Sequence, residues 1–265
     1  MPFANNDDVR IRFDVDGAGP PLVLHIGFVG ALEDLVDAGY VAALRDRFRL
    51  VLLDPRGQGQ SDKPHDATAY TVDRRAGDVL AVLDALEIER AHFWGYSLGG
   101  WIGFALGALA PTRVGALVIG GAHPFQGNPR SMENDWLLGG LRRGMAALVA
   151  EWEADVPDFW VSRGERARWL AADADALVAA RLNNLTEPDL PEAAIAGISA
   201  PTLLYAGTGD EPDPVRRAAQ IMPNASFVAL DGLDHAQGFA RLELILPHVQ
   251  TFLARADVSA LTTSP

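Results

Sequence analysis

Hydrophobic positions fall along this chain in two patterns. Short, mostly apolar runs occur at 22–24, 50–53, 93–94, 116–119, 202–205 and 227–230. Runs with few polar interruptions are typical of strands that are covered on both faces. Val9, Ile11 and Phe13 alternate with polar neighbours instead, which predicts a half-exposed edge strand ahead of the others.

Helical patterns lie between these runs. Apolar residues recur near the helical period over 72–86 and over 242–253. Strands that alternate with helices predict an α/β fold with right-handed crossovers and a mostly parallel sheet. Ligands bind beyond the carboxyl ends of such strands, so we expect functional residues directly after the apolar runs.

The region 124–196 breaks this alternation. It contains no buried-strand run, only helical patterns such as 137–149 and 169–182, and it holds four of the six tryptophans. We interpret it as a helical cap inserted over the carboxyl edge of the sheet. The predicted organisation is therefore the cap, a core in two parts and a flexible tail: 1–123 and 197–256 for the core, 257–265 for the tail.

Composition and charge narrow the function classes. With 49% hydrophobic and 22% charged residues, the chain has the composition of an ordinary soluble globular protein. Its formal net charge of −13 argues against nucleic acid or an anionic membrane surface as partners. The absence of cysteine excludes disulfides and thiolate catalysis. We expect a cytoplasmic protein, because no apolar run approaches the roughly 20 residues of a membrane span and the first residues lack a secretory pattern.

The strongest candidate for chemistry is the segment Gly95-Tyr96-Ser97-Leu98-Gly99. It matches the G-x-S-x-G motif, follows an apolar run and leads into a helical pattern, which is the context of a nucleophile elbow. The glycines two positions before and after Ser97 remove side chains that would collide where strand and helix meet. The alternative is that Ser97 only caps the helix through its hydroxyl group.

A serine nucleophile needs a base and an orienting carboxylate, in the chain order Ser, Asp or Glu, His. Of the six histidines, His235 lies after Ser97 and directly after the last predicted strand. Three of the other histidines precede the serine: His25, His65 and His92. His123 lies after the run 116–119, and His248 lies in the last amphipathic helix. His235 is therefore the predicted base.

The orienting acid is expected after the run 202–205. We choose Asp210, with Glu211 and Asp213 as alternatives, while each of the three also suits a turn. Asp234 ranks lower, because the side chains of adjacent residues rarely face each other.

A developing oxyanion needs backbone N–H donors. The expected pair is the amide of Leu98, directly after the nucleophile, and the amide of Phe28, in the glycine-rich loop 26–30. Gly27 lets that loop turn sharply. The alternative is an ordinary glycine-rich turn between a strand and a helix.

With these residues the chain resembles the α/β-hydrolase superfamily, in its esterase and lactonase branches with a helical cap. The resemblance covers nearly the whole chain, and the part from Tyr70 through Ala122 looks most like the enol-lactonases of aromatic catabolism. It implies an eight-stranded, mostly parallel sheet flanked by helices. Besides the elbow, it depends on four segments: 20–24, Asp54-Pro55-Arg56-Gly57-Gln58-Gly59-Gln60-Ser61-Asp62, 207–210 and Asp234-His235.

The chain also departs from the family pattern. The family usually has His-Gly at the oxyanion loop, whereas Ile26 occupies the histidine position here and His25 precedes it. The Glu-x-Pro that many relatives carry after the catalytic histidine is absent. Epoxide hydrolases and haloalkane dehalogenases have aspartate at the elbow, so Ser97 favours acyl chemistry. Asp54 and Arg56 are expected to form turns rather than to catalyse.

The expected function is that of a serine hydrolase that cleaves a small carboxylic ester or lactone through an acyl-enzyme, with water as the second reactant. No metal or organic cofactor is implied. Carbon–carbon bond hydrolysis, amide hydrolysis and peracid formation use the same triad and stay open, as does a binding protein that turns nothing over. The oligomeric state, a homodimer included, is also left open.

The expected substrate-binding residues come from the oxyanion loop, the elbow and the cap. They are Gly27, Tyr96, Trp101, His123, Phe125, Trp136, Trp152 and Trp160. Their rings, with that of Phe28, favour an apolar or aromatic substrate. The alternative is that most of these rings only pack the cap onto the core.

Overall fold

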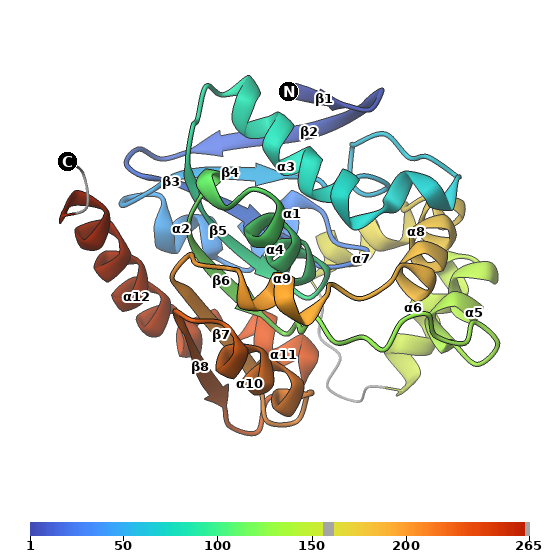
Figure 1. Ribbon diagram of the computed structural model, residues 1–265. Helices are drawn as coiled ribbons and strands as arrows, with labels where there is room; N and C mark the ends of the chain where they lie inside the picture. The colour runs from blue at the N-terminus through green and yellow to red at the C-terminus, as the bar shows by residue number, and fades with distance from the viewer. Residues whose placement is uncertain (156–161, 263–265) are drawn as a thin grey trace.

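The computed structural model describes residues 1–155 and 162–262, and its strands form one twisted sheet through the middle of the molecule (Figure 1). The strands are β1 (Phe3–Asn6), β2 (Val9–Asp16), β3 (Pro21–His25), β4 (Arg49–Leu53), β5 (Ala91–Tyr96), β6 (Val114–Gly120), β7 (Thr202–Gly207) and β8 (Ala225–Leu230). Their order is β1-β2-β4-β3-β5-β6-β7-β8. Strand β2 pairs antiparallel with β1 and β4, and the other neighbours pair in parallel. The predicted eight-stranded, mostly parallel sheet is confirmed.

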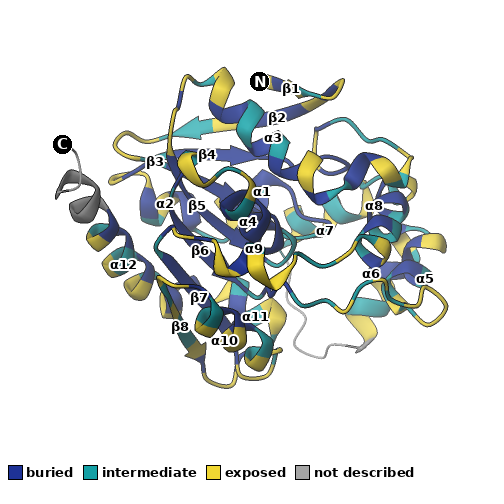
Figure 2. Ribbon diagram, viewed as in Figure 1, coloured by how far each residue is buried: buried dark blue, intermediate teal, exposed yellow. Residues whose placement is uncertain are grey.

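Helices cover both faces of the sheet. One layer consists of α3 (Val72–Ala85), α4 (Leu98–Leu109) and α10 (Pro212–Ile221), and the other of α1 (Leu32–Asp37), α2 (Tyr40–Leu44) and α12 (Leu242–Thr262). Successive strand residues face opposite layers, as Val23 and Leu24 of β3 do. The central strands are accordingly buried along their length (Figure 2). Four short elements complete the core: η1 (Ala67–Tyr70), η2 (Pro111–Arg113), α9 (Glu192–Ala196) and α11 (His235–Ala240).

The cap lies at one end of the sheet (Figure 1). Its helices are α5 (Trp136–Arg142), α6 (Met145–Asp155), α7 (Arg163–Leu170) and α8 (Ala174–Thr186). The predicted helix 137–149 is divided, because Gly144 has φ of +94° between α5 and α6. The predicted helix 169–182 is divided as well, since the Asp173 side chain accepts a hydrogen bond from the Ala176 amide and begins α8 there.

The structure differs from the predicted organisation at two boundaries, the end of the cap and the start of the tail. Helix α9 lies within the predicted cap range 124–196, yet it packs against α4 and α10 of the core and buries Ile195 there. Helix α12 continues to Thr262, through most of the segment 257–265 that was expected to be a flexible tail. Residues 263–265 lie outside the described residues.

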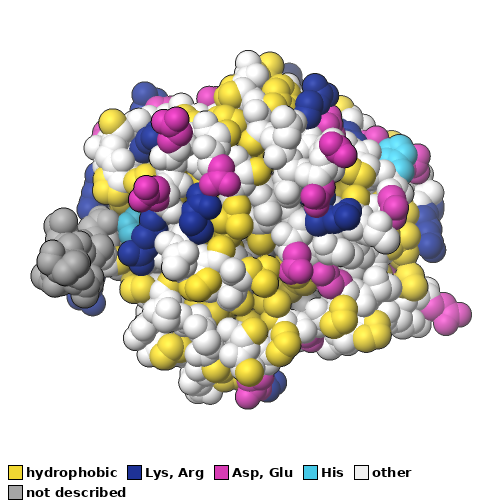
Figure 3. Space-filling model, turned by 45° about the horizontal axis from the view of Figure 1, so that its top comes forward, with side chains coloured by type: hydrophobic (Ala, Val, Ile, Leu, Met, Phe, Trp, Pro, Cys, Tyr) yellow, Lys and Arg dark blue, Asp and Glu magenta, His cyan; other side chains and the backbone are white. Residues whose placement is uncertain are grey.

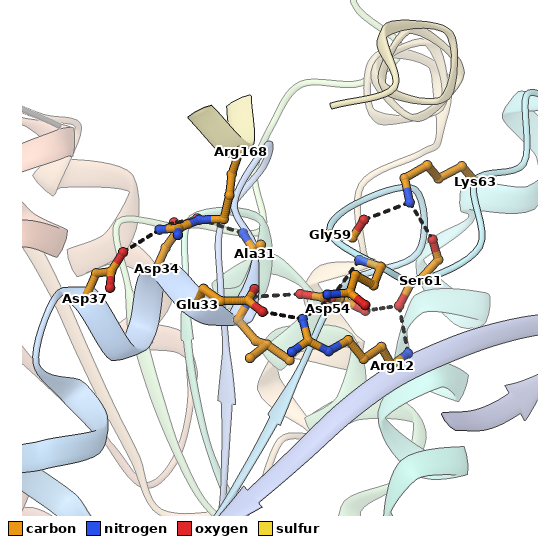
Figure 4. A network of polar contacts seen from close by, with 12 residues as sticks. Arg12, Ala31, Glu33, Asp34, Asp37, Asp54, Gly59, Ser61, Lys63 and Arg168 are labelled. Atoms are coloured by element: carbon orange, nitrogen blue, oxygen red, sulfur yellow. Dashed lines mark hydrogen bonds and ion pairs between the residues drawn. The ribbon is translucent and has the colours of Figure 1, made fainter. Parts of the chain in front are cut away.

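A polar network joins the cap to the core (Figure 4). Arg168 of α7 donates to Asp34 Oδ1 at 2.8 Å and to Asp37 Oδ2 at 2.6 Å, and both carboxylates belong to α1. Asp54, directly after β4, accepts a hydrogen bond of 2.8 Å from the Leu32 amide at the start of α1. Asp54 thus connects a turn to a helix, which agrees with the structural role expected for it.

The surface carries both signs of charge. Acidic and basic side chains are interspersed on the face shown in Figure 3, without a block of basic residues. In the part of the chain that the structure describes, no helix combines the length and the apolar character needed to cross a membrane.

Candidate active site

The elbow places Ser97 between β5 and α4 in a strained backbone conformation, with φ of 54° and ψ of −117°. Glycine is required on both sides. A Cβ atom on Gly95 would lie 2.3 Å from the Gly99 carbonyl oxygen, and one on Gly99 would lie 2.4 Å from the His25 carbonyl oxygen. The Ser97 side chain makes no capping hydrogen bond, so the helix-capping alternative does not account for it.

Three side chains that are far apart in the sequence meet beyond the carboxyl ends of β5, β7 and β8. The Ser97 Oγ lies 2.9 Å from His235 Nε2, and His235 Nδ1 lies 2.7 Å from Asp210 Oδ2. Because a carboxylate only accepts hydrogen bonds, Nδ1 is the donor to Asp210. Nε2 of the neutral ring is then free to accept the proton of the serine hydroxyl.

The rival acids have other partners. Glu211 lies 3.0 Å from His123 Nε2, and Asp213 pairs with Arg216 of its own helix. Asp234 accepts a hydrogen bond of 2.8 Å from the Gln237 amide and caps α11. Of the acids considered from the sequence, the structure brings Asp210 to His235.

Backbone contacts fix the two loops that carry the acid and the base. The Gly209 amide donates to the Leu233 carbonyl oxygen at 2.9 Å, which links the loops directly. The Tyr96 hydroxyl donates to the His235 carbonyl oxygen at 2.7 Å, and its ring lies 5.3 Å from the imidazole. These contacts hold the backbone of His235 while about half of its side chain stays exposed.

The predicted oxyanion loop lies against the elbow. A Cβ atom on Gly27 would lie 3.3 Å from the Ser97 Cβ. Gln58, from the turn after β4, holds this loop from behind: its Nε2 donates to the Gly27 carbonyl at 3.1 Å and to the Gly30 carbonyl at 2.9 Å. Its Oε1 accepts from the Val29 amide at 3.0 Å. The loop geometry around Phe28 therefore depends on a buried amide side chain.

Sequence reasoning did not single out Gln58 as a functional residue. The available signal was its place between Gly57 and Gly59 in the motif after β4, where the glycines have positive φ values of 82° and 52°. A large polar side chain between two such glycines points to a turn that aims it inward.

A cavity of about 250 Å³ opens above the elbow. Seven residues of the predicted site line it: Phe28, Ser97, Leu98, Trp101, His123, Asp210 and His235. The remaining lining comes from Gly121, Ala122, Gln126, Arg130, Leu137, Arg181, Asn184, Glu211 and Val215. The candidate nucleophile, base, acid and oxyanion donors therefore line the same small cavity.

Known proteins with a similar sequence or fold agree with this architecture. Residues 20–154 match the family model described as the alpha/beta hydrolase fold. The chain belongs to this family.

Relatives of the chain include a 3-oxoadipate enol-lactonase of Acinetobacter baylyi, 33% identical over 184 residues, which are 64% of each chain. A non-heme chloroperoxidase of Streptomyces lividans is 28% identical over 266 residues, covering 89% of this chain and 92% of that protein. Among solved structures, the enol-lactonase from Burkholderia xenovorans LB400 superposes with a TM-score of 0.80 at 26% identity, covering 96% and 100% of the two chains. The match to the Acinetobacter enzyme leaves about a third of its length unaligned.

Several residues predicted to bind substrate lie outside the lining of this cavity. Tyr96 and Gly27 support the site from behind, and Phe125 packs under Arg217, with 4.2 Å between guanidinium and ring centre. Trp136 and Trp152 are absent from the lining of this cavity in the described part of the chain. Trp160 lies outside the described residues.

The cap tryptophans pack on one another instead. Trp136 is 62% exposed, and its ring lies 6.4 Å from that of Trp152, which in turn lies 5.0 Å from Trp169. The cap has its own small apolar core around Leu148 and Leu177, and Trp152 and Trp169 complete it. A cap of short helices needs such a core, and large rings supply most of its buried area.

Polar side chains from the cap line the cavity where aromatic ones were expected. Arg181 donates to both oxygens of Asp135, from Nε at 3.0 Å and from Nη2 at 2.5 Å. Burial opposes ionisation of Asp135, but the hydrogen bonds from Arg181 outweigh it and lower the pKa of this carboxyl group. Arg130, Gln126 and Asn184 complete the polar wall.

His25 illustrates the departure from the family pattern. Its ring is buried beneath the elbow, where Nδ1 lies 2.9 Å from the Ile26 carbonyl oxygen. Burial lowers the pKa of His25 to about 4, so the ring is neutral at pH 7. It packs against Gly99 and takes no place in the cavity lining of the described residues.

Proposed function

We propose that the chain is a serine hydrolase that cleaves small carboxylic esters or lactones through an acyl-enzyme intermediate. The observation that carries this proposal is the contact series Ser97 Oγ–His235 Nε2–Asp210 Oδ2, at 2.9 and 2.7 Å, on one wall of the cavity. The strained elbow holds the hydroxyl at that wall before any substrate arrives.

In the first half-reaction the Ser97 oxygen attacks the carbonyl carbon while Nε2 of His235 takes the hydroxyl proton. Asp210 stabilises the imidazolium and keeps the ring in its orientation. The amides of Phe28 and Leu98 stabilise the negative oxygen of the tetrahedral intermediate. When the intermediate collapses, the single bond between the acyl carbon and the ester oxygen breaks and the carbonyl group forms again. The leaving alkoxide receives the proton from His235.

In the second half-reaction water replaces the alcohol. His235 removes one proton from the water, the resulting hydroxide attacks the acyl carbon, and Ser97 leaves with the proton returned from the imidazolium. The products are a carboxylic acid and an alcohol; from a lactone both groups belong to one molecule.

The size of the cavity supports a small substrate. A volume of about 250 Å³ lies just below the range that is typical of ligand pockets, ~300–1,000 Å³. The relatives named as enol-lactonases support lactone cleavage in particular, one by sequence and one by structure. The chloroperoxidase relative makes peracid formation the alternative to include in any test.

The direct test is a substrate panel on the purified chain. It contains p-nitrophenyl esters of short acids, simple lactones, aryl amides and, with acetate and peroxide present, a halogenation assay. We expect ester or lactone turnover in the wild type and its loss in Ser97→Ala, with unchanged thermal unfolding as the control for folding. Turnover at the wild-type level in Ser97→Ala would contradict the proposal.

A further inference from the structure

The cap side of the cavity carries a positive charge that the mechanism above does not use. The lining residues of the region 126–184 are Gln126, Arg130, Leu137, Arg181 and Asn184. Four of these five carry donor groups, and two are guanidinium groups. In a chain of net charge −13, this is a local reversal of sign.

The two arginines differ in their partners. Arg181 is bound by Asp135 through both carboxylate oxygens, so its charge is compensated within the protein. Arg130 donates from Nε to the neutral Asn128 Oδ1 at 3.2 Å. Within the described residues, Arg130 has no carboxylate at ion-pair distance.

The backbone of Arg130 is nevertheless fixed. Its amide donates to the Leu185 carbonyl oxygen at 2.7 Å, and the Asn128 side-chain amide donates to the Asn184 carbonyl at 2.9 Å. These bonds tie the loop to the end of α8. Arg130 is half-buried and its backbone is fixed, while its Nη groups stay available to a ligand. Binding of a ligand to these groups therefore costs little conformational entropy.

The negative groups in the lining are already engaged. Asp210 accepts from His235, and Glu211 lies against His123. Both stand on the side of the triad, at the end of β7 and the start of α10. Arg130 is therefore the lining cation that forms no ion pair with a carboxylate among the described residues. Asp135, which Arg181 holds, interacts with Arg130 only at longer range.

We propose that Arg130 binds a free carboxylate of the substrate, so that the enzyme prefers esters or lactones whose acyl or alcohol part is itself an acid. A guanidinium and a carboxylate form two parallel, charge-assisted hydrogen bonds, which explains a cation at this wall of a small cavity. This inference rests on the proposed function for the reaction and adds the class of substrate.

The kinetic test compares p-nitrophenyl hydrogen adipate with p-nitrophenyl hexanoate, which has a methyl group in place of the carboxylate. The readout is the ratio of kcat/KM for the acidic ester to that for the neutral ester. We expect Arg130→Gln to lower this ratio by roughly 10- to 100-fold, and Arg130→Lys to lower it less. Arg142→Gln, on the exposed side of α5, is the matched control and should leave the ratio unchanged.

A binding test that needs no turnover separates this inference from the proposed function. Calorimetry measures adipate binding to Ser97→Ala and to Ser97→Ala with Arg130→Gln. Binding that disappears with Arg130→Gln supports the anion site even if no ester is hydrolysed, in which case the proposed reaction alone fails. Ester turnover with an unchanged ratio in Arg130→Gln, or adipate binding that Arg130→Gln does not weaken, would overturn the anion site.

Discussion

Ser97 combines a reactive position with an unfavourable backbone. A residue with a side chain at φ of 54° and ψ of −117° carries strain of about 1–3 kcal/mol. The close packing of Gly95 on Gly99 imposes this backbone conformation on Ser97. In this conformation the Ser97 hydroxyl lies at hydrogen-bond distance from His235. The strained backbone of Ser97 therefore accompanies the placement of its hydroxyl group next to His235.

That strain leads to a prediction on stability. Ser97→Gly and Ser97→Ala both remove the hydroxyl, but only alanine keeps the Cβ that the backbone disfavours. Relief of strain should exceed the entropy that glycine adds to the unfolded chain, about 0.4–1 kcal/mol. We expect Ser97→Gly to be more stable than Ser97→Ala by about 1 kcal/mol in urea unfolding. An alanine variant that is more stable than Ser97→Gly by about 0.4–1 kcal/mol would show that the elbow is unstrained.

Gln58 makes a second prediction at this scale. Its side-chain amide makes three hydrogen bonds to the loop that carries Phe28, and it is 3% exposed. Gln58→Leu should leave the loop in place only part of the time, so kcat should fall by roughly 10- to 100-fold while KM changes little. Gln60→Leu, an exposed neighbour, is the control. A normal kcat in a correctly folded Gln58→Leu variant would refute the positioning role.

At the scale of elements, helix α7 holds the cap to helix α1 through Arg168, as Figure 4 shows. Glu165 lies on the same helix, where burial and then the charge of Asp34 raise its pKa to about 7. In the unfolded chain this carboxyl group titrates near 4.5. The folded protein therefore holds the proton of Glu165 more tightly than the unfolded chain does.

The sign of the resulting pH dependence follows from that difference. The stabilisation from protonated Glu165 is complete below about pH 4.5 and is lost as the pH rises through about 7. We expect Glu165→Gln to reduce the decline in thermal stability over this interval. Glu133→Gln, an exposed carboxyl group on the cap, should leave the decline unchanged. Parallel curves for wild type and Glu165→Gln would contradict the assignment.

At the scale of the whole molecule, a buried ion pair ties the turn after β4 to the helix layer. Arg56 donates to both oxygens of Asp78 on α3, at 2.7 and 2.6 Å, and both side chains are almost fully buried. Asp78→Ala leaves a buried guanidinium without its partner, which costs about 3–5 kcal/mol. We expect Tm to fall by roughly 10 °C. The control Asp84→Ala, on an exposed part of the same helix, should shift Tm little, and an equal shift would contradict this account.

The sheet and the elbow could be predicted from sequence because their signals are local. Apolar runs marked the strands from β3 onward, and alternation marked β2. Gly95 reflects its contact with Gly99, four residues away. Strand β1, with only Ala4 buried in the sequence FANN, carries no such run. The order of the strands depends on long-range pairing, which the sequence pattern does not show, and the family resemblance supplied only the number of strands.

The cavity wall could not be predicted because its signal is not local. Nothing in the sequence around Arg130 distinguishes a cavity arginine from an exposed one such as Arg142. The cap tryptophans were assigned to the pocket, yet a ring on a short helix can face the cavity, the core of the cap or the solvent. Here Trp152 and Trp136 face one another, with Trp136 largely exposed, because the cap needs its own packing.

The central claim is that Ser97 is a nucleophile activated by His235 and oriented by Asp210. Reaction with a fluorophosphonate, followed by peptide mass spectrometry, tests it most directly. The account predicts one adduct per chain, on Ser97, and a labelling rate that drops by roughly 10³-fold or more in His235→Ala. An adduct on another residue, or labelling of His235→Ala at the wild-type rate, would contradict it.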